Sequence, residues 1–408
     1  MKILYLSHRI PYPPNKGDKI RSFNEIRYLS SFHEIDLAAM VDNPADFRYE
    51  SDLKKYCRNV MLAPLNPLKG KVRGLFRMIQ GQPLSVGYFY SKSLQKKIDL
   101  LLSQKDYDAI VCFSSPMAEY LYASQSRNNL FSEKKHPRLI MDFCDLDSDK
   151  WRQYAENCAF PLNLIYRMEY KFLLEYEKKI NRNFDRSIFI SQQEASLFYH
   201  LYPRACKTVV VPNGVDHQYF SPQDSALPLA EKKGPVLLFT GAMDYYANVD
   251  GVCRFCTDIF PIIKETYTDA QFYIVGSKPD PRVRDLKKIK DVHVTGFVED
   301  IRPYYEMADV SVIPLRIARG VQNKVLEAMS MKKAVVTTST AVQGIRTDKI
   351  RPFLIADEPE YFAHQVIKIL KNKSLRDELG QMAGEYITAF FDWEKNICEI
   401  DNMIRRFN

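Results

Sequence analysis

The sequence predicts an α/β protein with two doubly wound parallel-sheet domains, and three observations lead to this fold class. Short apolar runs bounded by polar turns alternate with longer amphipathic segments along most of the chain, which is typical of parallel strands covered by helices on both faces. The pattern restarts after the polar, proline-containing residues 221–234, whose composition is that of a linker. A chain of 408 residues, 46% of them hydrophobic, is also too long for one core. We therefore expect two Rossmann-like halves facing a central cleft.

The first half contains candidate strands with helical stretches between several of them. The strands are expected at residues 3–7, 35–41, 60–62, 109–113, 139–143, 187–191 and 209–211. The clearest helical stretches cover residues 19–31, 94–103 and 164–181.

The second half repeats this order and places a glycine after several strands. The strands are expected at residues 236–240, 271–275, 293–295, 310–313 and 334–337, and residues 358–408 are expected to be helical throughout. Gly241, Gly276 and Gly296 each close a strand, and the turns that face a ligand lie at this end of the strands in open α/β sheets.

Composition excludes several classes of protein. The formal net charge of +8 is moderate for this length, whereas a nucleic-acid-binding protein usually has a denser basic face. The eight cysteines lack metal-ligand spacing, and the single close pair, Cys253 and Cys256, is better explained by buried thiols than by a metal or redox site. Free cysteines and a first apolar run too short for an export signal indicate a reducing cytoplasm.

The most informative segment is residues 313–329, which indicates a buried strand, a glycine-hinged loop and the start of a helix. A helix start presents free backbone N–H groups and favours an anion. Arg316, Arg319 and Lys324 add positive charge there, and Glu327 lies one turn deeper, where a carboxylate can accept hydrogen bonds from a ribose diol. A phosphate clamp next to a diol acceptor fits a nucleoside diphosphate. The alternative for Arg316 and Lys324 is a salt bridge to a surface carboxylate.

Six motifs, in this order along nearly the whole chain, resemble those of the family-4 retaining glycosyltransferases of the GT-B fold. Residues 13–18 (Pro-Pro-Asn-Lys-Gly-Asp) are similar to the family's loop near the donor phosphates, residues 211–216 to its interdomain hinge, and residues 241–244 to the loop that opens the donor domain. Residues 296–300 are similar to the segment along the base, residues 324–329 to the signature helix, and residues 392–394 to the segment that crosses back onto the first domain. More narrowly, residues 241–248 and 319–324 resemble a bacterial exopolysaccharide-associated subgroup of sugar transferases.

The resemblance implies an acceptor-binding domain at residues 1–212, joined by residues 385–408, and a donor-binding domain at residues 213–384. It implies transfer of a sugar with retention, without a metal or other cofactor, from a UDP- or GDP-linked donor to a glycan or lipid-linked acceptor in surface polysaccharide assembly. The donor-binding candidates are Gly17, Gly241, Val298, Arg316, Gly320, Val321, Gln322, Asn323, Lys324 and Glu327. The catalytic candidates are Asp145 and Arg319, and the acceptor-binding candidates are His8 and Asp142, although Asp142 could instead cap or orient its loop.

The sequence departs from the family pattern at the phosphate site. The family usually has two glutamates separated by seven residues, but the first position here is Arg319; the usual arginine and lysine of the donor domain are replaced by Ala242 and Ala247. Over these four positions the net charge is zero in both cases. We therefore expect Arg319, helped by Arg316 or Lys324, to replace the missing phosphate-binding pair.

Residues 69–97 contain seven lysines and arginines and no acid, with apolar residues interleaved. This segment could rest on the anionic inner surface of the plasma membrane, or it could be an ordinary solvated face.

Two rival functions also remain: a nucleotide-sugar epimerase of the same fold, and a non-catalytic glycan-binding or partner subunit, which the replacement at Arg319 suggests.

Overall fold

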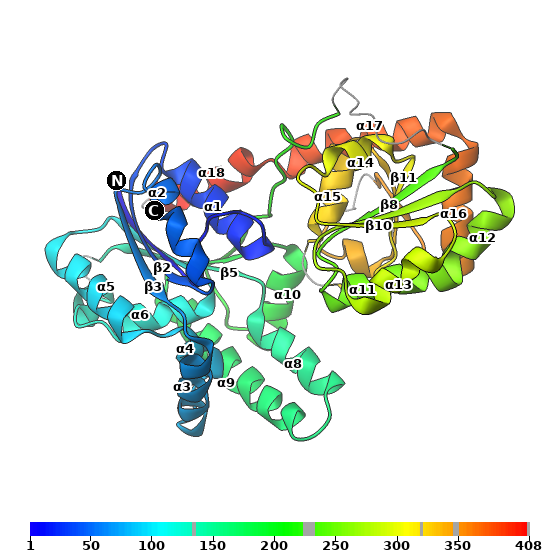
Figure 1. The fold of residues 1–408 in the computed structure, drawn as a ribbon. Helices are drawn as coiled ribbons and strands as arrows, with labels where there is room; N and C mark the ends of the chain where they lie inside the picture. Colours follow the sequence, from blue (N-terminus) through cyan, green and yellow to red (C-terminus); the bar gives the residue numbers. More distant parts are fainter. Residues whose placement is uncertain (133–135, 223–232, 319–320, 346–350, 406–408) are drawn as a thin grey trace. The chain divides into compact units, whose positions relative to one another are not determined.

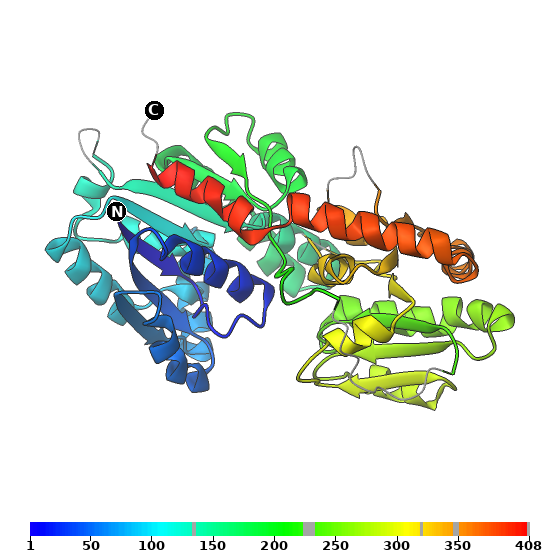
Figure 2. The same ribbon diagram turned by 90° about the horizontal axis from the view of Figure 1, so that it is seen from above.

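Two parallel β-sheets organise the chain, each within its own structural unit. The computed structural model describes residues 1–132, 136–222, 233–318, 321–345 and 351–405. The N-terminal unit comprises Met1–Pro212 and Ile397–Asn408, and the C-terminal unit comprises Asn213–Asn396. The boundary after Pro212 coincides with the expected one, but the segment that returns to the N-terminal unit begins at Ile397 rather than at residue 385. Figures 1 and 2 draw the elements of both units, with helices on both sides of each sheet.

The N-terminal unit is built on a seven-stranded sheet of order β3-β2-β1-β4-β5-β6-β7. Its strands are β1 (Lys2–Ser7), β2 (Glu34–Val41), β3 (Asn59–Pro64), β4 (Ala109–Phe113), β5 (Arg138–Cys144), β6 (Arg186–Phe189) and β7 (Thr208–Val210). All neighbouring pairs are parallel, and Ile3 of β1 lies opposite Ile35 and Ala109. Strand order therefore reverses between β1 and β4, and such reversal points are where open α/β sheets bind ligands.

The helices of the N-terminal unit connect these strands and cover the sheet. They are α1 (Gly17–Leu29), α2 (Glu50–Leu53), α3 (Pro67–Ile79), α4 (Leu84–Phe89), α5 (Lys92–Gln104), α6 (Glu119–Tyr122), α7 (Arg127–Leu130), α8 (Asp147–Asn157), α9 (Leu162–Asn183) and α10 (Gln192–Leu201). The last helix, α18 (Trp393–Arg405), contributes most of its length to this unit. The predicted helices correspond to α1, α5 and α9, whereas α3 and α4 were not among them.

The C-terminal unit repeats the same topology in a six-stranded sheet of order β10-β9-β8-β11-β12-β13. Its strands are β8 (Val236–Thr240), β9 (Gln271–Val275), β10 (Val292–Gly296), β11 (Val310–Ile313), β12 (Ala334–Thr337) and β13 (Leu354–Ile355). Its helices are α11 (Tyr246–Arg254), α12 (Phe260–Thr266), α13 (Pro281–Asp285), α14 (Arg302–Met307), α15 (Asn323–Ser330), α16 (Pro359–Lys371) and α17 (Lys373–Phe390). The two sheets confirm the predicted pair of Rossmann-like, doubly wound domains.

Glycines close three neighbouring strands of the C-terminal unit, as the sequence predicted. Gly241 and Gly276 directly follow β8 and β9, and Gly296 ends β10. A Cβ atom on Gly276 would lie 1.6 Å from the carbonyl oxygen of Gly241, so only glycine fits there. The amide of Gly276 in turn donates to the carbonyl of Gly296 at 3.2 Å. The three turns are thus packed backbone against backbone at the carboxyl edge of the sheet.

Within the described ranges, none of the helices has both the length and the apolar content that crossing a lipid bilayer requires.

Candidate functional site

Lys324 brings the start of α15 together with α11 and the turn after β8 at the carboxyl edge of the C-terminal sheet. It is the second residue of α15, and its Nζ donates to Asn248 Oδ1 of α11 at 2.9 Å. The ammonium group also lies 5.3 Å from the ring centroid of Phe239 in β8. A Cβ atom on Gly241 would lie 3.2 Å from Lys324 Cε. The glycine turn after β8 therefore leaves room for the lysine stem beneath it.

The surroundings of Lys324 make its charge responsive to pH. Burial lowers the pKa of the lysine to about 8, although the nearby carboxylate of Glu327 opposes this shift. A buried ammonium that has a neutral amide as its hydrogen-bond acceptor is poorly compensated. An anion bound next to Nζ would complete the compensation and hold the proton on the lysine.

Glu327 lies on the same helix, three residues further on, and is held by a tyrosine. The hydroxyl of Tyr305, in α14, donates to Glu327 Oε2 at 3.1 Å and also shares a hydrogen bond of 2.8 Å with Thr240 Oγ1 at the end of β8. Burial raises the pKa of Glu327, while the tyrosine hydrogen bond and the charge of Lys324 oppose the rise. No described residue donates a hydrogen bond to Glu327 Oε1, so this oxygen can accept one from a ligand hydroxyl.

The structure gives Arg316 the role that the sequence analysis named as its alternative. Its guanidinium is paired with both carboxylate oxygens of Asp250 in α11; the contact from Nε to Oδ2 measures 3.0 Å. The hydrogen bond and charge of Asp250 raise the pKa of the arginine. Because Asp250 already compensates much of the positive charge, Arg316 is a weaker candidate for the diphosphate than Lys324, and its donor-binding role stays a prediction.

Most of the other donor-site candidates lie directly before Lys324 in the chain, and Val298 lies in the segment after β10. Val321 is buried, Gln322 precedes α15 in an extended conformation, and Asn323 is its first residue. Val298 follows β10 and packs partly buried against the core of the unit. Arg319 and Gly320 lie outside the described residues. That Arg319 replaces the phosphate-binding arginine and lysine of the family therefore stays a prediction.

Gly17 is the first residue of α1 in the N-terminal unit, where the chain is exposed. A Cβ atom there would meet no atom within 4 Å. The protein itself therefore places no steric demand for glycine at this position. Glycine would be required here only if a ligand came close to the start of α1. The donor-binding role of Gly17 therefore stays a prediction.

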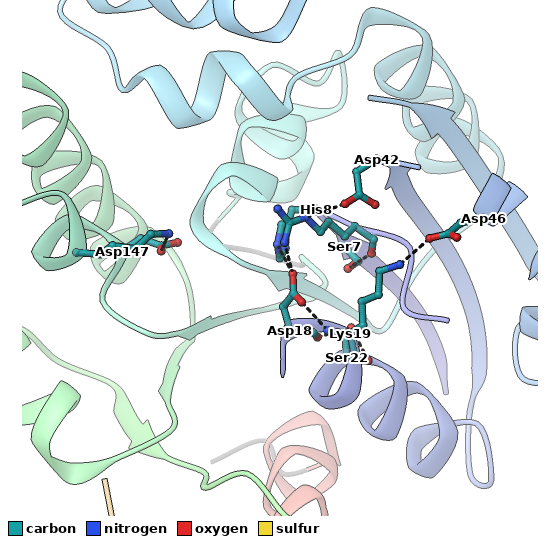
Figure 3. A network of polar contacts seen from close by, with 10 residues as sticks. Ser7, His8, Asp18, Lys19, Ser22, Asp42, Asp46 and Asp147 are labelled. Atoms are coloured by element: carbon teal, nitrogen blue, oxygen red, sulfur yellow. Dashed lines mark hydrogen bonds and ion pairs between the residues drawn. The ribbon is translucent and has the colours of Figure 1, made fainter. Parts of the chain in front are cut away.

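His8 is fixed in an ion-pair cluster at the carboxyl end of β1 (Figure 3). Its Nε2 lies 3.3 Å from Asp18 Oδ2, and the same oxygen accepts a hydrogen bond of 2.7 Å from Arg9. Burial favours protonation of Asp18, but the hydrogen bonds and charges of His8 and Arg9 outweigh it and hold the carboxyl pKa far below its usual range. The imidazole also stacks on Phe113, with 5.9 Å between ring centroids. The cluster fixes the position of His8, and acceptor binding by it stays a prediction.

Asp142 lies inside the N-terminal unit rather than on an acceptor-facing surface. Its carboxylate has no exposed area; Oδ2 accepts two hydrogen bonds from Arg21, at 2.6 and 2.9 Å, and Oδ1 accepts one from the Cys144 amide at 2.8 Å. Arg21 also lies 3.0 Å from Glu25, whose pKa is raised by burial and by the charge of Asp142. The acceptor-binding prediction for Asp142 is therefore wrong: the residue anchors α1 to β5 and orients the loop after Cys144.

Asp145 begins that loop, one residue after β5 ends at Cys144. Cys144 has a φ of 58°, a conformation that residues other than glycine rarely adopt and that redirects the chain at the sheet edge. Asp145 is partly exposed. Its predicted catalytic role is compatible with this place at the carboxyl edge and stays a prediction. In Figure 3, the neighbouring Asp147 lies apart from the cluster around His8.

Sequence reasoning missed several residues that hold the site together. Asn248 belongs to the segment that carried the subgroup resemblance, yet only its neighbour Ala247 was weighed there. Tyr305 and Asp250 gave no local signal, because their partners Glu327 and Arg316 are 22 and 66 residues away in the chain.

The close cysteine pair lies in one continuous helical segment, with Cys253 in α11 and Cys256 in the π-helical residues 255–259 that follow. Burial raises the pKa of Cys253 and brings that of Cys256 to about 12, so both are thiols at neutral pH, as expected for packing residues. Among the described residues, no group of three or more His, Cys, Asp or Glu side chains is placed to hold a metal ion.

Comparison with known proteins identifies the kind of enzyme. Residues 234–372, which include β8, Lys324 and Glu327, match the family model described as "Glycosyl transferases group 1". The chain is a glycosyltransferase of the GT-B fold. The match confirms the resemblance that the sequence predicted. This glycosyltransferase is also 26% identical to an uncharacterized 44.6 kDa protein in the cps region of Klebsiella pneumoniae, over 98% of both chains.

Solved structures share the fold of the whole glycosyltransferase. Sucrose-phosphate synthase from Thermosynechococcus elongatus superposes with a TM-score of 0.71 at 18% identity, covering 99% of this chain and 98% of the other. HepE of Anabaena, solved in complex with UDP, gives a TM-score of 0.65 at 14% identity, with 99% of both chains covered.

Proposed function

We propose that this glycosyltransferase moves a sugar from a nucleoside diphosphate to a glycan or lipid-linked acceptor in the assembly of a surface polysaccharide. The observation that carries the proposal is the cluster at the carboxyl edge of the C-terminal sheet, where Lys324 lies beneath the Gly241 turn and Glu327 presents Oε1. A cation next to a glycine turn suits a diphosphate, and a carboxylate one helical turn away suits a ribose.

The donor would be held by groups that differ in what they recognise. Lys324 and the backbone N–H groups of Asn323 and Lys324 at the start of α15 would bind the diphosphate oxygens, and Glu327 would accept hydrogen bonds from the ribose hydroxyls. As the bond from the anomeric carbon to the diphosphate breaks, negative charge grows on the leaving oxygens, and Lys324 would stabilise it. Removal of one such group typically lowers the rate about 100- to 1,000-fold.

Retention of configuration and independence from metals follow from the family resemblance. In that mechanism, the acceptor oxygen bonds to the anomeric carbon on the face that the diphosphate leaves, and the acceptor proton passes to the departing phosphate. Asp145, Arg319 and His8 are the residues that we propose act on the reacting sugar, the diphosphate and the acceptor, respectively. Asp142 no longer belongs to this set.

Two relatives support the choice of substrates. HepE of Anabaena was solved with UDP and also with UDP-glucose, which makes UDP-linked sugars the first donors to test and GDP-linked sugars the second. The relative in the cps region of Klebsiella pneumoniae supports a polysaccharide acceptor. We place the reaction in the cytoplasm, where nucleotide sugars are made and where free thiols such as those of this chain persist.

The test combines donor binding with turnover. Calorimetric titration of the full chain with UDP and GDP should give a saturable signal that Glu327→Ala weakens, and a donor–acceptor screen in the presence of EDTA should give a product that retains the anomeric configuration by NMR. Release or epimerisation of the sugar from donor alone would favour the epimerase, and no nucleotide signal at all would favour a non-catalytic subunit. Either result would overturn the proposal.

A further inference from the structure

Helix α3 of the N-terminal unit carries an apolar stripe that faces solvent. Its members recur at intervals of three and four residues, which places them on one side of the helix. They are exposed by 46% to 84%: Leu68, Val72, Leu75, Phe76 and Ile79. Leu68, Val72 and Phe76 also line a shallow, almost wholly apolar depression together with Lys69 and Arg73.

The inward side of α3 contains two glycines, Gly70 and Gly74, beside the buried Met78. A Cβ atom on Gly70 would lie 2.9 Å from the ring of Tyr88, and one on Gly74 would lie 2.8 Å from the carbonyl oxygen of Leu84. The helix therefore packs tightly against α4 through its glycines and turns five of its large apolar side chains outward. This arrangement is the reverse of an ordinary surface helix, whose apolar stripe faces the core.

Positive charge borders the stripe, and no acid lies nearby in the chain. Residues 65–98 contain no aspartate or glutamate. Arg73 donates to backbone carbonyls of residues 87 and 88, and Arg77 pairs with Glu119 at 2.8 Å. In contrast, no described carboxylate pairs with Lys69 or Lys71, which lie on the two flanks of the stripe. An apolar stripe between lysines is complementary to a bilayer surface that contains anionic lipid.

The geometry of α3 fits a helix that lies on a bilayer. With 13 residues, α3 is too short to span one. In Figure 1, α3 projects away from the strands at the lower end of the N-terminal unit. A second copy of the chain is a poorer occupant, because a two-fold contact through this face would bring the same lysines of both copies together.

We propose that α3 docks this glycosyltransferase on an anionic lipid surface, with the apolar stripe in the headgroup–acyl boundary and Lys69 and Lys71 against the lipid phosphates. The inference goes beyond the proposed sugar transfer, and its test does not depend on turnover.

The test measures binding of the full chain to lipid vesicles by co-sedimentation. The protein should bind phosphatidylcholine vesicles that contain about 30% of the anionic lipid phosphatidylglycerol. It should bind vesicles of pure phosphatidylcholine far more weakly. Val72→Ser/Phe76→Ser should lower the partition coefficient roughly 100-fold, since each side chain contributes about tenfold when buried in the boundary. Lys69→Ala/Lys71→Ala should lower it about 30-fold, because one basic residue near an anionic surface contributes about fivefold.

Matched controls separate docking from misfolding. Leu100→Ser/Tyr361→Ser removes two side chains that are also exposed, by 56% and 54%, but lie outside α3. This control should bind vesicles like the wild type, and all variants should keep the wild-type thermal midpoint. The proposal fails if the wild type does not bind anionic vesicles, if it binds neutral ones equally well, or if the α3 variants bind unchanged. It also fails if vesicle binding is absent and the α3 variants instead convert a dimer to a monomer in analytical ultracentrifugation.

Discussion

The pKa of Lys324 leads to a quantitative prediction for donor binding. In the free protein, burial brings this pKa to about 8. A bound diphosphate next to Nζ favours the protonated lysine, so the pKa in the complex lies above the pKa in the free protein. The part of the affinity for a nucleoside diphosphate that depends on the protonated lysine is therefore present well below pH 8. It is lost as the pH rises through this value.

The size of the loss follows from the fraction of protonated lysine. With a pKa of about 8, that fraction is about 0.9 at pH 7 and about 0.1 at pH 9. If the complex keeps Lys324 protonated over this range, the dissociation constant for the nucleoside diphosphate should rise about tenfold, which corresponds to about 1.4 kcal/mol. At pH 8, binding should take up about half a proton per ligand.

Isothermal titration calorimetry measures both quantities, with the proton uptake obtained from buffers of different ionisation enthalpy. Lys324→Arg is the matched control, because a guanidinium stays charged up to pH 12 and beyond. The affinity ratio of wild type to this variant removes the titration of the nucleotide itself. Equal pH dependence of the two proteins, or no proton uptake by the wild type at pH 8, would refute the assignment of Lys324 to the diphosphate.

Four further substitutions test other features of the structure. Arg316→Ala should change the dissociation constant for the donor nucleotide less than about threefold in calorimetry, because its carboxylate partner already compensates the charge. Gly276→Ala should lower the free energy of unfolding in urea by more than about 4 kcal/mol, because the new Cβ atom would meet backbone atoms. Gly17→Ala, where no atom lies near the new Cβ, should change it by less than about 0.5 kcal/mol. A mild effect at Gly276 would contradict the packing of the turns. Asp142→Ala should cost about 3 to 5 kcal/mol because it leaves Arg21 buried without its main partner; unchanged stability with a raised KM for the acceptor would restore the acceptor-binding role.

Much of the fold could be predicted from local patterns. The strands expected at residues 3–7 and 236–240 are β1 and β8 almost to the residue, because short apolar runs between polar turns have few alternatives. In contrast, β13 has two residues at a sheet edge, too few to show a period. Helix α3 was missed because two glycines, which disfavour a helix, interrupt it, and α4 was missed because it has only 6 residues.

The candidate site could be predicted less completely than the fold. Gly241, Lys324 and Glu327 were found because a glycine after a strand and charges at a helix start are visible over a few residues. Tyr305 could not be found, because its hydroxyl is brought to Glu327 only by the packing of α14 against β8.

The sequence by itself determined the two doubly wound sheets, the family resemblance and the segment in which a donor phosphate is expected, since these depend on periodicity and on neighbours in the chain. Only the tertiary structure decided which charges are available there. It paired Arg316 with Asp250, buried Asp142 against Arg21, left Lys324 with a neutral partner and turned the apolar side of α3 outward. The physical reason is that the energy of a charge depends on its burial and on partners within a few ångströms, and those partners come from distant parts of the chain.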